Sequence, residues 1–246
     1  MKLFVGLDVS LAKTVLCAIT EHGKIVMEVA SEPEPLIRNL RSLEGTLEAI
    51  GLEAGPLSQW LHRAMTAAGM PAVLMETRQV KGALKAMPIK TDRRDAEGIA
   101  RLLHLGWFRP VHCKSVSSQE LRAILAARKA IQGNMIVLEM SLRGLLRNFG
   151  LKVGTISRGR FGARIRELVE GNTMLETASH PMLRVRSALR QELAGLEKLV
   201  RQMASEDPVC LCLMTMPGIG AVVALTYRSA IDDPSRFRSS KNVGPW

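Results

Sequence analysis

The chain has 246 residues, enough for one large domain or two small ones, each with a sizeable hydrophobic core. Hydrophobic residues make up 47% and charged residues 23% of the chain, a composition that excludes an intrinsically disordered protein. The formal net charge of +11 favours a polyanionic partner, and nucleic acid before others. Because only 4% of the residues are aromatic, a single-strand binder built on base stacking is disfavoured.

Neither the cysteines nor the apolar runs indicate an export route. The four cysteines have no zinc-site spacing, and we interpret them as buried small hydrophobes in a reducing cytosol. Asp8 and Lys13 interrupt the first apolar run, so we expect no signal peptide. No apolar run reaches the length of a bilayer span. We therefore expect a cytoplasmic protein with no membrane partner.

The first thirty residues predict three antiparallel strands. Residues 2–10 alternate, and the second face of this strand is small or apolar except for Asp8. A carboxylate at such a position is costly unless it is paired or binds a metal. Residues 14–20 and 24–30 form the next two strands, joined by a turn at His22-Gly23. Three such strands with an acid in the middle of the first are the opening of an RNase H-like fold.

The next segment alternates between helices and strands and therefore predicts an α/β arrangement. Residues 46–53 form a strand that delivers Glu53 to its carboxyl end, where α/β sheets collect ligands. Around it we expect another strand at 71–76 and helices at 34–43, 57–68 and 77–87.

A short acidic motif opens the following helix. Thr91 is a suitable N-cap, and Asp92 and Asp95 lie three residues apart in the first turn of a helix that extends to Trp107. Residues three apart share a helix face, so both carboxylates could bind one hard divalent cation such as magnesium. A capped helix with ordinary surface charges also explains the motif. For the motif alone this is the favoured interpretation, because short acidic motifs have many false positives.

The second half of the sequence predicts an antiparallel helical hairpin. Two apolar seams with steps of three and four residues indicate its helices: Leu121, Ile124, Ile131, Met135, Leu138, Leu142, Leu145 and Phe149 in the first, and Met182, Val185, Leu189, Leu193, Leu196, Val200 and Met203 in the second. Each seam suits either an intramolecular core or a dimer interface.

Two segments suggest nucleic-acid contacts. The connection at 152–166 is rich in glycine and carries Arg158, Arg160, Arg164 and Arg166, which we expect to contact phosphates rather than only solvent. Near the end, Met216-Pro217-Gly218-Ile219-Gly220 precedes a helix at 222–231, a helix-hairpin-helix-like pattern that exposes backbone N–H groups to phosphate. The residues that we assign to this second site are Gly218, Gly220 and Arg228.

Three motifs together resemble a known family. Gly6-Leu7-Asp8-Val9-Ser10, Gly51-Leu52-Glu53-Ala54-Gly55 and the segment 90–96 resemble the DEDD-type insertion-sequence transposases of the IS110 class, which are bridge-RNA-guided recombinases. The resemblance implies a Holliday-junction-resolvase-like, RNase H-like domain at 1–115, a helical hairpin or coiled coil at 116–206, and an incomplete α-helical transposase domain at 207–246.

The same resemblance implies the site and the partners. Asp8, Glu53, Asp92 and Asp95 would be the catalytic residues and would bind Mg²⁺ or Mn²⁺. DNA would be the substrate, with a structured guide RNA as a second partner and a homo-oligomer formed through the helical hairpin.

One expected family feature is missing. The family adds a catalytic serine in a Ser-Gly context, downstream of a segment that matches residues 242–246, and this chain contains no Ser-Gly dipeptide. Ser239 and Ser240 are better interpreted as loop residues. We therefore expect a transposase cut off before its nucleophile and inactive in strand exchange. The alternatives are a DEDD nuclease or junction resolvase that uses water, and a non-catalytic nucleic-acid-binding remnant.

Overall fold

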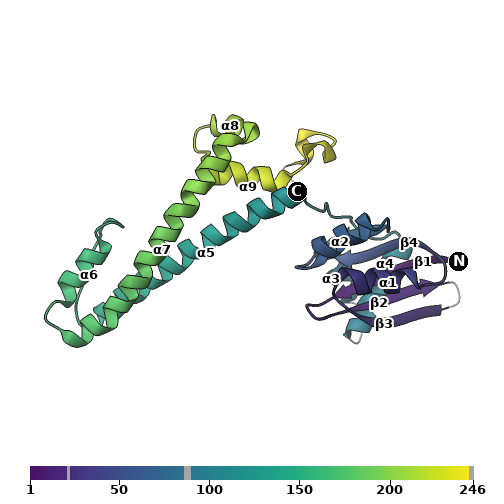
Figure 1. Ribbon diagram of the computed structural model, residues 1–246, viewed down its shortest axis with the longest axis horizontal. Helices are drawn as coiled ribbons and strands as arrows, with labels where there is room; N and C mark the ends of the chain where they lie inside the picture. The colour runs from purple at the N-terminus through teal and green to yellow at the C-terminus, as the bar shows by residue number, and fades with distance from the viewer. Residues whose placement is uncertain (21–22, 86–89, 244–246) are drawn as a thin grey trace. The chain divides into compact units, whose positions relative to one another are not determined.

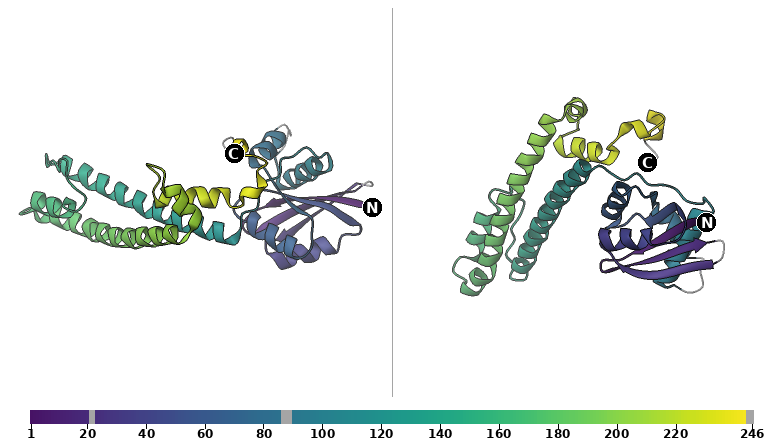
Figure 2. Two further views of the ribbon diagram at one scale, coloured as in Figure 1. Left: turned by 90° about the horizontal axis from the view of Figure 1, so that it is seen from above. Right: turned by 45° about the vertical axis from the view of Figure 1, so that its right-hand side comes forward.

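The structure is a computed structural model that describes residues 1–20, 23–85 and 90–243 (Figures 1 and 2). The chain divides into two compact units, Met1–Lys114 and Ser115–Trp246. Each unit has its own hydrophobic core, and we describe each by itself.

The first unit is built on a five-stranded mixed sheet. Its strands are β1 (Lys2–Val9), β2 (Lys13–Thr20), β3 (Gly23–Ala30), β4 (Thr46–Glu53) and β5 (Ala72–Met75), in the order β3-β2-β1-β4-β5. The first three strands pair antiparallel, whereas β1, β4 and β5 are parallel. The strands predicted from the alternation are confirmed with small shifts at their ends, and the predicted turn residue His22 lies outside the described residues.

Helices cover both faces of this sheet. On one face, α1 (Pro33–Arg41) and α2 (Ser58–Ala67) pack on the side chains of Leu3, Val5 and Leu7. On the other face lie α3 (Thr77–Leu84) and α4 (Asp92–His104). The predicted helix end at Met87 falls outside the described residues. Alternate residues of β1 therefore point to opposite faces of the sheet: Leu3, Val5 and Leu7 to an apolar face, and Asp8 to the other face.

Two glycines allow α4 to lie directly on the sheet. Gly6 of β1 is paired with Gly51 of β4, and both lie beneath α4. A methyl group at Gly6 would overlap the backbone oxygen of Ala96 and the backbone nitrogen of Ala100. A methyl group at Gly51 would lie 2.6 Å from Cδ1 of Leu103. At Gly6 the helix backbone thus packs on the strand backbone with no side chain between them, and at Gly51 the Leu103 side chain fills the space.

The second unit is entirely helical. Its long helices, α5 (Val116–Arg147) and α7 (Thr173–Glu206), lie side by side. Arg128 pairs with Glu197 at 2.8 Å and Glu139 with Arg186 at 2.6 Å, so positions later in α5 meet positions earlier in α7. The two helices are therefore antiparallel. Shorter helices follow at α6 (Phe161–Val169), α8 (Pro208–Met214) and α9 (Ala221–Ile231). Within the described residues, no helix is both long and apolar enough to cross a bilayer.

Thirteen of the fifteen predicted seam residues are buried or half-buried in the second unit, and two are exposed. Val185 is 53% and Phe149 is 60% exposed, so these two lie outside the intramolecular core. In α7 the buried position next to Val185 belongs to Arg186, which is only 5% exposed. Its guanidinium contacts Glu139, the backbone oxygen of Arg158 and the ring of Phe161. This ion pair replaces an apolar contact and turns Val185 outward.

The basic connection is not a plain loop, because α6 lies within it. Phe161, Ile165 and Val169 recur every four residues and pack on α5 and α7. The sequence interpretation overlooked this short periodicity because the interleaved arginines and glycines dominate the segment.

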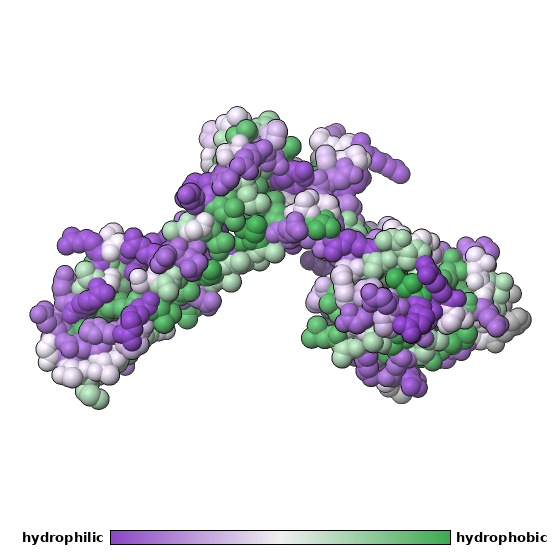
Figure 3. Space-filling model, viewed as in Figure 1, coloured by the Kyte–Doolittle hydropathy of each residue, from purple (hydrophilic) through white to green (hydrophobic). Residues whose placement is uncertain are grey.

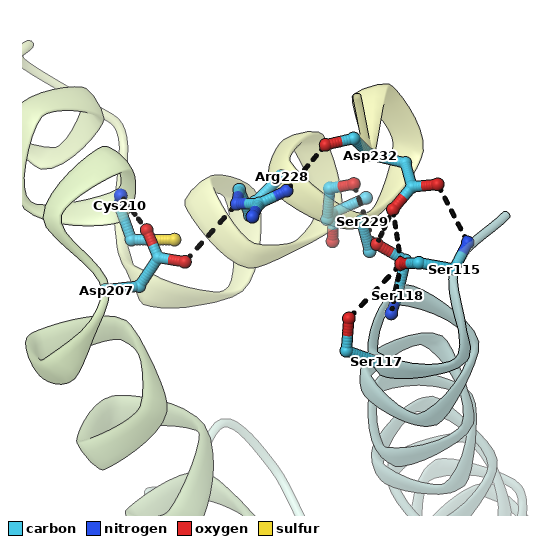
Figure 4. A network of polar contacts seen from close by, with 9 residues as sticks. Ser115, Ser117, Ser118, Asp207, Cys210, Arg228, Ser229 and Asp232 are labelled. Atoms are coloured by element: carbon cyan, nitrogen blue, oxygen red, sulfur yellow. Dashed lines mark hydrogen bonds and ion pairs between the residues drawn. The ribbon is translucent and has the colours of Figure 1, made fainter. Parts of the chain in front are cut away.

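A carboxylate fixes the first turn of α5 (Figure 4). Asp232, which follows α9 and has a φ of 64°, accepts hydrogen bonds from the backbone N–H of Ser115 at 2.8 Å and from the Ser118 hydroxyl at 2.6 Å. The Ser115 hydroxyl also donates to it. Arg228 holds this turn by donating to the Asp232 backbone oxygen and by an ion pair with Asp207 at 3.3 Å. The end of α9 is thereby fastened to the start of α5.

We expect Gly6→Ala to lower the free energy of unfolding by about 3 kcal/mol, because the added methyl group must push α4 off the sheet. The matched control is Gly82→Ala in α3, where an added methyl group meets nothing within 4 Å and should stabilise the helix by roughly 0.5–1 kcal/mol. Urea unfolding followed by circular dichroism measures both changes. Equal stability of the two variants would contradict the packing argument.

Candidate functional site

A cavity of about 680 Å³ opens where β1 and β4 end. It is bounded by the loops after these strands, by α3, and by the start of α4. Its ionisable lining residues are Asp8, Glu53, Lys81, Lys85, Lys90 and Asp95. Three of the four acids predicted from separate motifs are therefore brought together in one cavity.

The register of the two central strands positions Asp8 and Glu53. Each lies two residues after one of the paired glycines, Gly6 and Gly51, and therefore on the same face of the sheet as its glycine. Because β1 and β4 are parallel, both carboxylates emerge at the same edge. This is the edge at which α/β sheets bind ligands.

The first turn of α4 brings the other two acids. As predicted, Thr91 caps this helix by accepting a hydrogen bond from the backbone N–H of Arg94. Asp95 precedes Ala96, whose backbone touches β1, so its carboxylate faces the cavity. Asp92 lies one turn earlier, is exposed, and is not among the residues that line the cavity.

The electrostatics of Asp8 link all four acids. The pKa of Asp8 is raised from 3.8 to about 6, first by burial and then by the negative charges of Asp95, Asp92 and Glu53, in that order. Lys90 acts in the opposite direction and lowers this pKa. Asp92 is therefore near enough to influence Asp8, although it lies outside the cavity lining. Such a raised carboxyl pKa is typical of clustered acids that lack a counter-cation.

The four carboxylates are suitable ligands for a hard divalent cation, but they do not converge closely enough to coordinate one ion together. Carboxylate oxygens are the ligands that magnesium and manganese prefer. Within the described residues, no group of three or more histidine, cysteine or acidic side chains is close enough to enclose a metal ion.

Sequence reasoning did not assign a role to the lysines of the cavity. Lys81 lies 3.7 Å from Glu53, and Lys85 and Lys90 also line the cavity. The four-residue spacing of Lys81 and Lys85 on a helix that follows a parallel strand was the signal available in the sequence.

The residues predicted to bind nucleic acid form two separate groups in the second unit. Arg158, Arg160 and Arg166 are exposed before and within α6, and Arg164 pairs with Glu167 at 3.2 Å. Gly218, with a φ of 85°, and Gly220 lie in the turn before α9. The first group lies beside the first half of α7, where the Arg158 backbone oxygen accepts a hydrogen bond from Arg186, whereas Gly218 and Gly220 follow α8 beyond the end of α7. They are not one site.

Arg228 belongs to neither group as a free cation. Its guanidinium contacts Asp207 and the backbone oxygen of Asp232, and so holds α8, α9 and the Asp232 turn together (Figure 4).

We expect Asp8→Asn to raise the free energy of unfolding at about pH 8 in metal-free buffer by on the order of 1 kcal/mol after allowance for solvent screening. The pKa of Asp8 in the folded chain, about 6, lies above the ordinary value of 3.8. The wild-type chain therefore loses stability as pH rises through this range and loses nothing below it. Unfolding curves across this pH range measure the difference, with the exposed Glu44→Gln as control. A difference that does not change with pH would contradict the electrostatic account.

Comparison with known proteins places this geometry in a family. A family model described as transposase, of the DEDD IS110 type, matches residues 5–150, which contain all four acids. A second, described as the transposase IS116/IS110/IS902 family, matches residues 210–246.

Relatives agree with both matches. The chain is 27% identical to the transposase for insertion sequence element IS1111A of Coxiella burnetii, over 96% of this chain and 66% of the relative. It is 24% identical to a putative transposase of Sinorhizobium fredii, over 98% of this chain and 61% of the relative. A probable family 20 transposase of Pseudomonas aeruginosa is 25% identical over 98% of this chain and 72% of its own length. The chain spans about two thirds of the length of these curated relatives. Since the first family model alone covers more than half of the chain, the protein belongs to the IS110 family of insertion-sequence transposases.

Proposed function

We propose that this chain carries the metal-dependent DNA-cleaving site of an insertion-sequence transposase, formed by Asp8, Glu53, Asp92 and Asp95. The observation that carries the proposal is the shared cavity: acids from β1, β4 and α4 converge there, and the pKa of Asp8 responds to the other three. Clustered acids that destabilise one another are expected where a cation completes the site.

The strand order supports an RNase H-like assignment for the first unit. Three antiparallel strands continue into two parallel ones, and a helix lies directly on the central strand that carries the first acid. This is the arrangement that the opening of the sequence predicted. The assignment gives the four acids their proposed role as a Mg²⁺ or Mn²⁺ site.

In this proposal the chain's own residues fix where the phosphodiester lies. A bound divalent cation would neutralise the phosphate charge and orient the phosphodiester. Asp8 and Glu53 are held by neighbouring parallel strands, and Asp95 by a helix whose backbone touches β1, so three rigid elements set their spacing.

Nucleic-acid binding is proposed for the second unit. The exposed arginines at 158, 160 and 166, together with Arg164, support contacts to phosphates of DNA and of a structured guide RNA. The backbone N–H groups at Gly218 and Gly220 support a second contact at the start of α9. Arg228 contributes by holding the Asp232 turn rather than by touching the nucleic acid.

Self-association through the hairpin is proposed from its exposed apolar surface. Figure 3 shows hydrophobic patches among hydrophilic surface along the long helices. Exposed apolar side chains there include Ile136, Val137 and Met140 of α5 and Val185 and Leu199 of α7. Exposed apolar patches of this kind are typical of protein interfaces.

A water-dependent DEDD nuclease is the second candidate, because hydrolysis would need only the acids and a cavity of about 680 Å³, which has room for water beside a phosphate. A non-catalytic nucleic-acid binder would use the arginines alone. Magnesium-dependent cleavage separates an enzyme from a binder, and a covalent protein–DNA adduct separates recombinase chemistry from hydrolysis.

We expect calorimetry to detect binding of Mg²⁺ or Mn²⁺, and Asp8→Asn combined with Asp92→Asn to abolish it. The same cation should raise the melting temperature of the wild-type chain, because it binds the folded state. The matched control is Glu97→Gln, also on α4 but bonded to Lys24 and Arg101 away from the cavity lining. Unchanged binding in the double variant would reject the assignment.

We expect DNA affinity to fall steeply with salt, with a log–log slope of roughly −5 if six phosphates are contacted. Replacement of Arg158, Arg160 and Arg164 by alanine should flatten the slope by about 2.5. Fluorescence anisotropy with duplex DNA measures it. Three exposed cations of the first unit, Lys2, Arg38 and Arg41, serve as the control set. If both triple variants behave alike, the arginines near α6 act only through overall charge.

A further inference from the structure

The carboxylate cavity has a basic wall that the metal site does not use. Lys81, Lys85 and Lys90 line it together with Asp8, Glu53 and Asp95, so the cavity holds three lysines and three acids. Lys81 and Lys85 lie four residues apart, on the last turn of α3 and just after it, and therefore on one side of this helix. Lys81 and Lys85 thus form a row along α3, whereas Lys90 lies just before α4.

The orientation of this row is fixed by the opposite side of α3. Val80 is 1% exposed and packs in the core with Met75 and Ile99. With Val80 anchored there, α3 cannot rotate to withdraw its lysines from the cavity. The side chain of Lys81 is nevertheless 66% exposed, so its amino group is accessible to a ligand from solvent.

The contact between Lys81 of α3 and Glu53 of β4 is loose compared with the ion pair that Glu97 makes within α4. Its nitrogen–oxygen distance is 3.7 Å, whereas Arg101 contacts Glu97 at 2.6 Å, and the Glu97 side chain is only 14% exposed. Exposed ion pairs contribute roughly 0–1 kcal/mol, so Lys81 can leave Glu53 at little cost. Glu97 is in a fixed network, whereas Lys81 is an exchangeable partner.

We propose that Lys81 and Lys85, aided by Lys90, bind the phosphate backbone of the DNA strand that enters the carboxylate cavity. The inference rests on the proposed function, since it needs a phosphodiester at the acids. Without a cation, the lysines balance the acids, as the lowering effect of Lys90 on the Asp8 pKa illustrates. A bound divalent cation would cancel part of the charge of the acids and weaken their attraction for the lysines, which would leave a phosphate as the anion within the lysines' reach.

This exchange predicts opposite effects on the two ligands. Lys81→Ala should strengthen manganese binding by about threefold, because a competing positive charge has been removed beside Glu53. Lys81→Ala combined with Lys85→Ala should reduce the magnitude of the log–log salt slope of duplex DNA binding by about 1.8, or roughly 0.9 for each lost phosphate contact. Calorimetry with manganese and anisotropy at constant magnesium concentration measure these quantities in the full chain.

The control removes two positive charges at the other end of β1 and β4. Lys2 pairs with Glu48 at 3.4 Å with a similar exposure, 69%, and Arg41 ends α1 just before β4 begins. Lys2→Ala combined with Arg41→Ala should leave manganese affinity and the salt slope near their wild-type values.

The outcomes divide cleanly. A smaller slope in the lysine variant alone supports the proposal. An unchanged slope with stronger manganese binding would make the lysines counter-ions only, and an equal change in both double variants would make the effect one of overall charge. A lower melting temperature with loss of both ligands would indicate a structural role. Each of these last three results overturns the proposal.

If the wild-type chain bound no manganese, the proposed metal site would fail, whereas the slope comparison would still decide the role of the lysines.

Discussion

Backbone contact between β1 and α4 determines whether the candidate site exists. Gly6 removes the side chain that would otherwise separate them, and the paired Gly51 makes room for Leu103 from the same helix. The start of α4 is therefore held at a fixed height above the sheet. Asp95 lies immediately before the contact residue Ala96, so this height sets its distance from Asp8. A chain with larger residues at these positions would separate the acids.

That packing concentrates negative charge, which opposes folding. Burial, and after it the charges of Asp95, Asp92 and Glu53, raise the pKa of Asp8, so its ionised form is costly in the folded chain. The first unit compensates with a large apolar core beneath the other face of the sheet, where Leu3, Val5 and Leu7 are fully buried. The two faces of β1 thus have different roles. Leu3, Val5 and Leu7 on one face stabilise the fold, whereas Asp8 on the other face carries a charge that is costly in the folded chain. This division is common where sites are built on rigid elements.

The sequence predicted the elements that have one clear period and missed those in which two signals compete. The alternation in β1 gave both its position and the face of Asp8, and Thr91 with its two following acids located the start of α4. Around α7, the apolar period suggested Val185, but an ion pair between Arg186 and Glu139 takes the buried position. A rule based on hydrophobicity cannot anticipate a buried arginine, because its partner lies 47 residues away. Lys81 is likewise brought beside Glu53 only by the fold, so its spacing from Lys85 did not identify its partner.

The Asp232 contact has a consequence for the order in which the chain matures. Ser115 and Ser118, at the start of α5, receive their carboxylate partner from a residue more than a hundred positions later, separated by 117 residues in the case of Ser115. During synthesis the first unit, whose sheet and covering helices all lie before residue 115, can fold as soon as it leaves the ribosome. The first turn of α5 must wait for Asp232 before that carboxylate can secure it. Completion of the helical unit is therefore tied to translation of the segment after α9, and an interrupted nascent chain would hold a finished sheet domain followed by a helix whose first turn is free to fray.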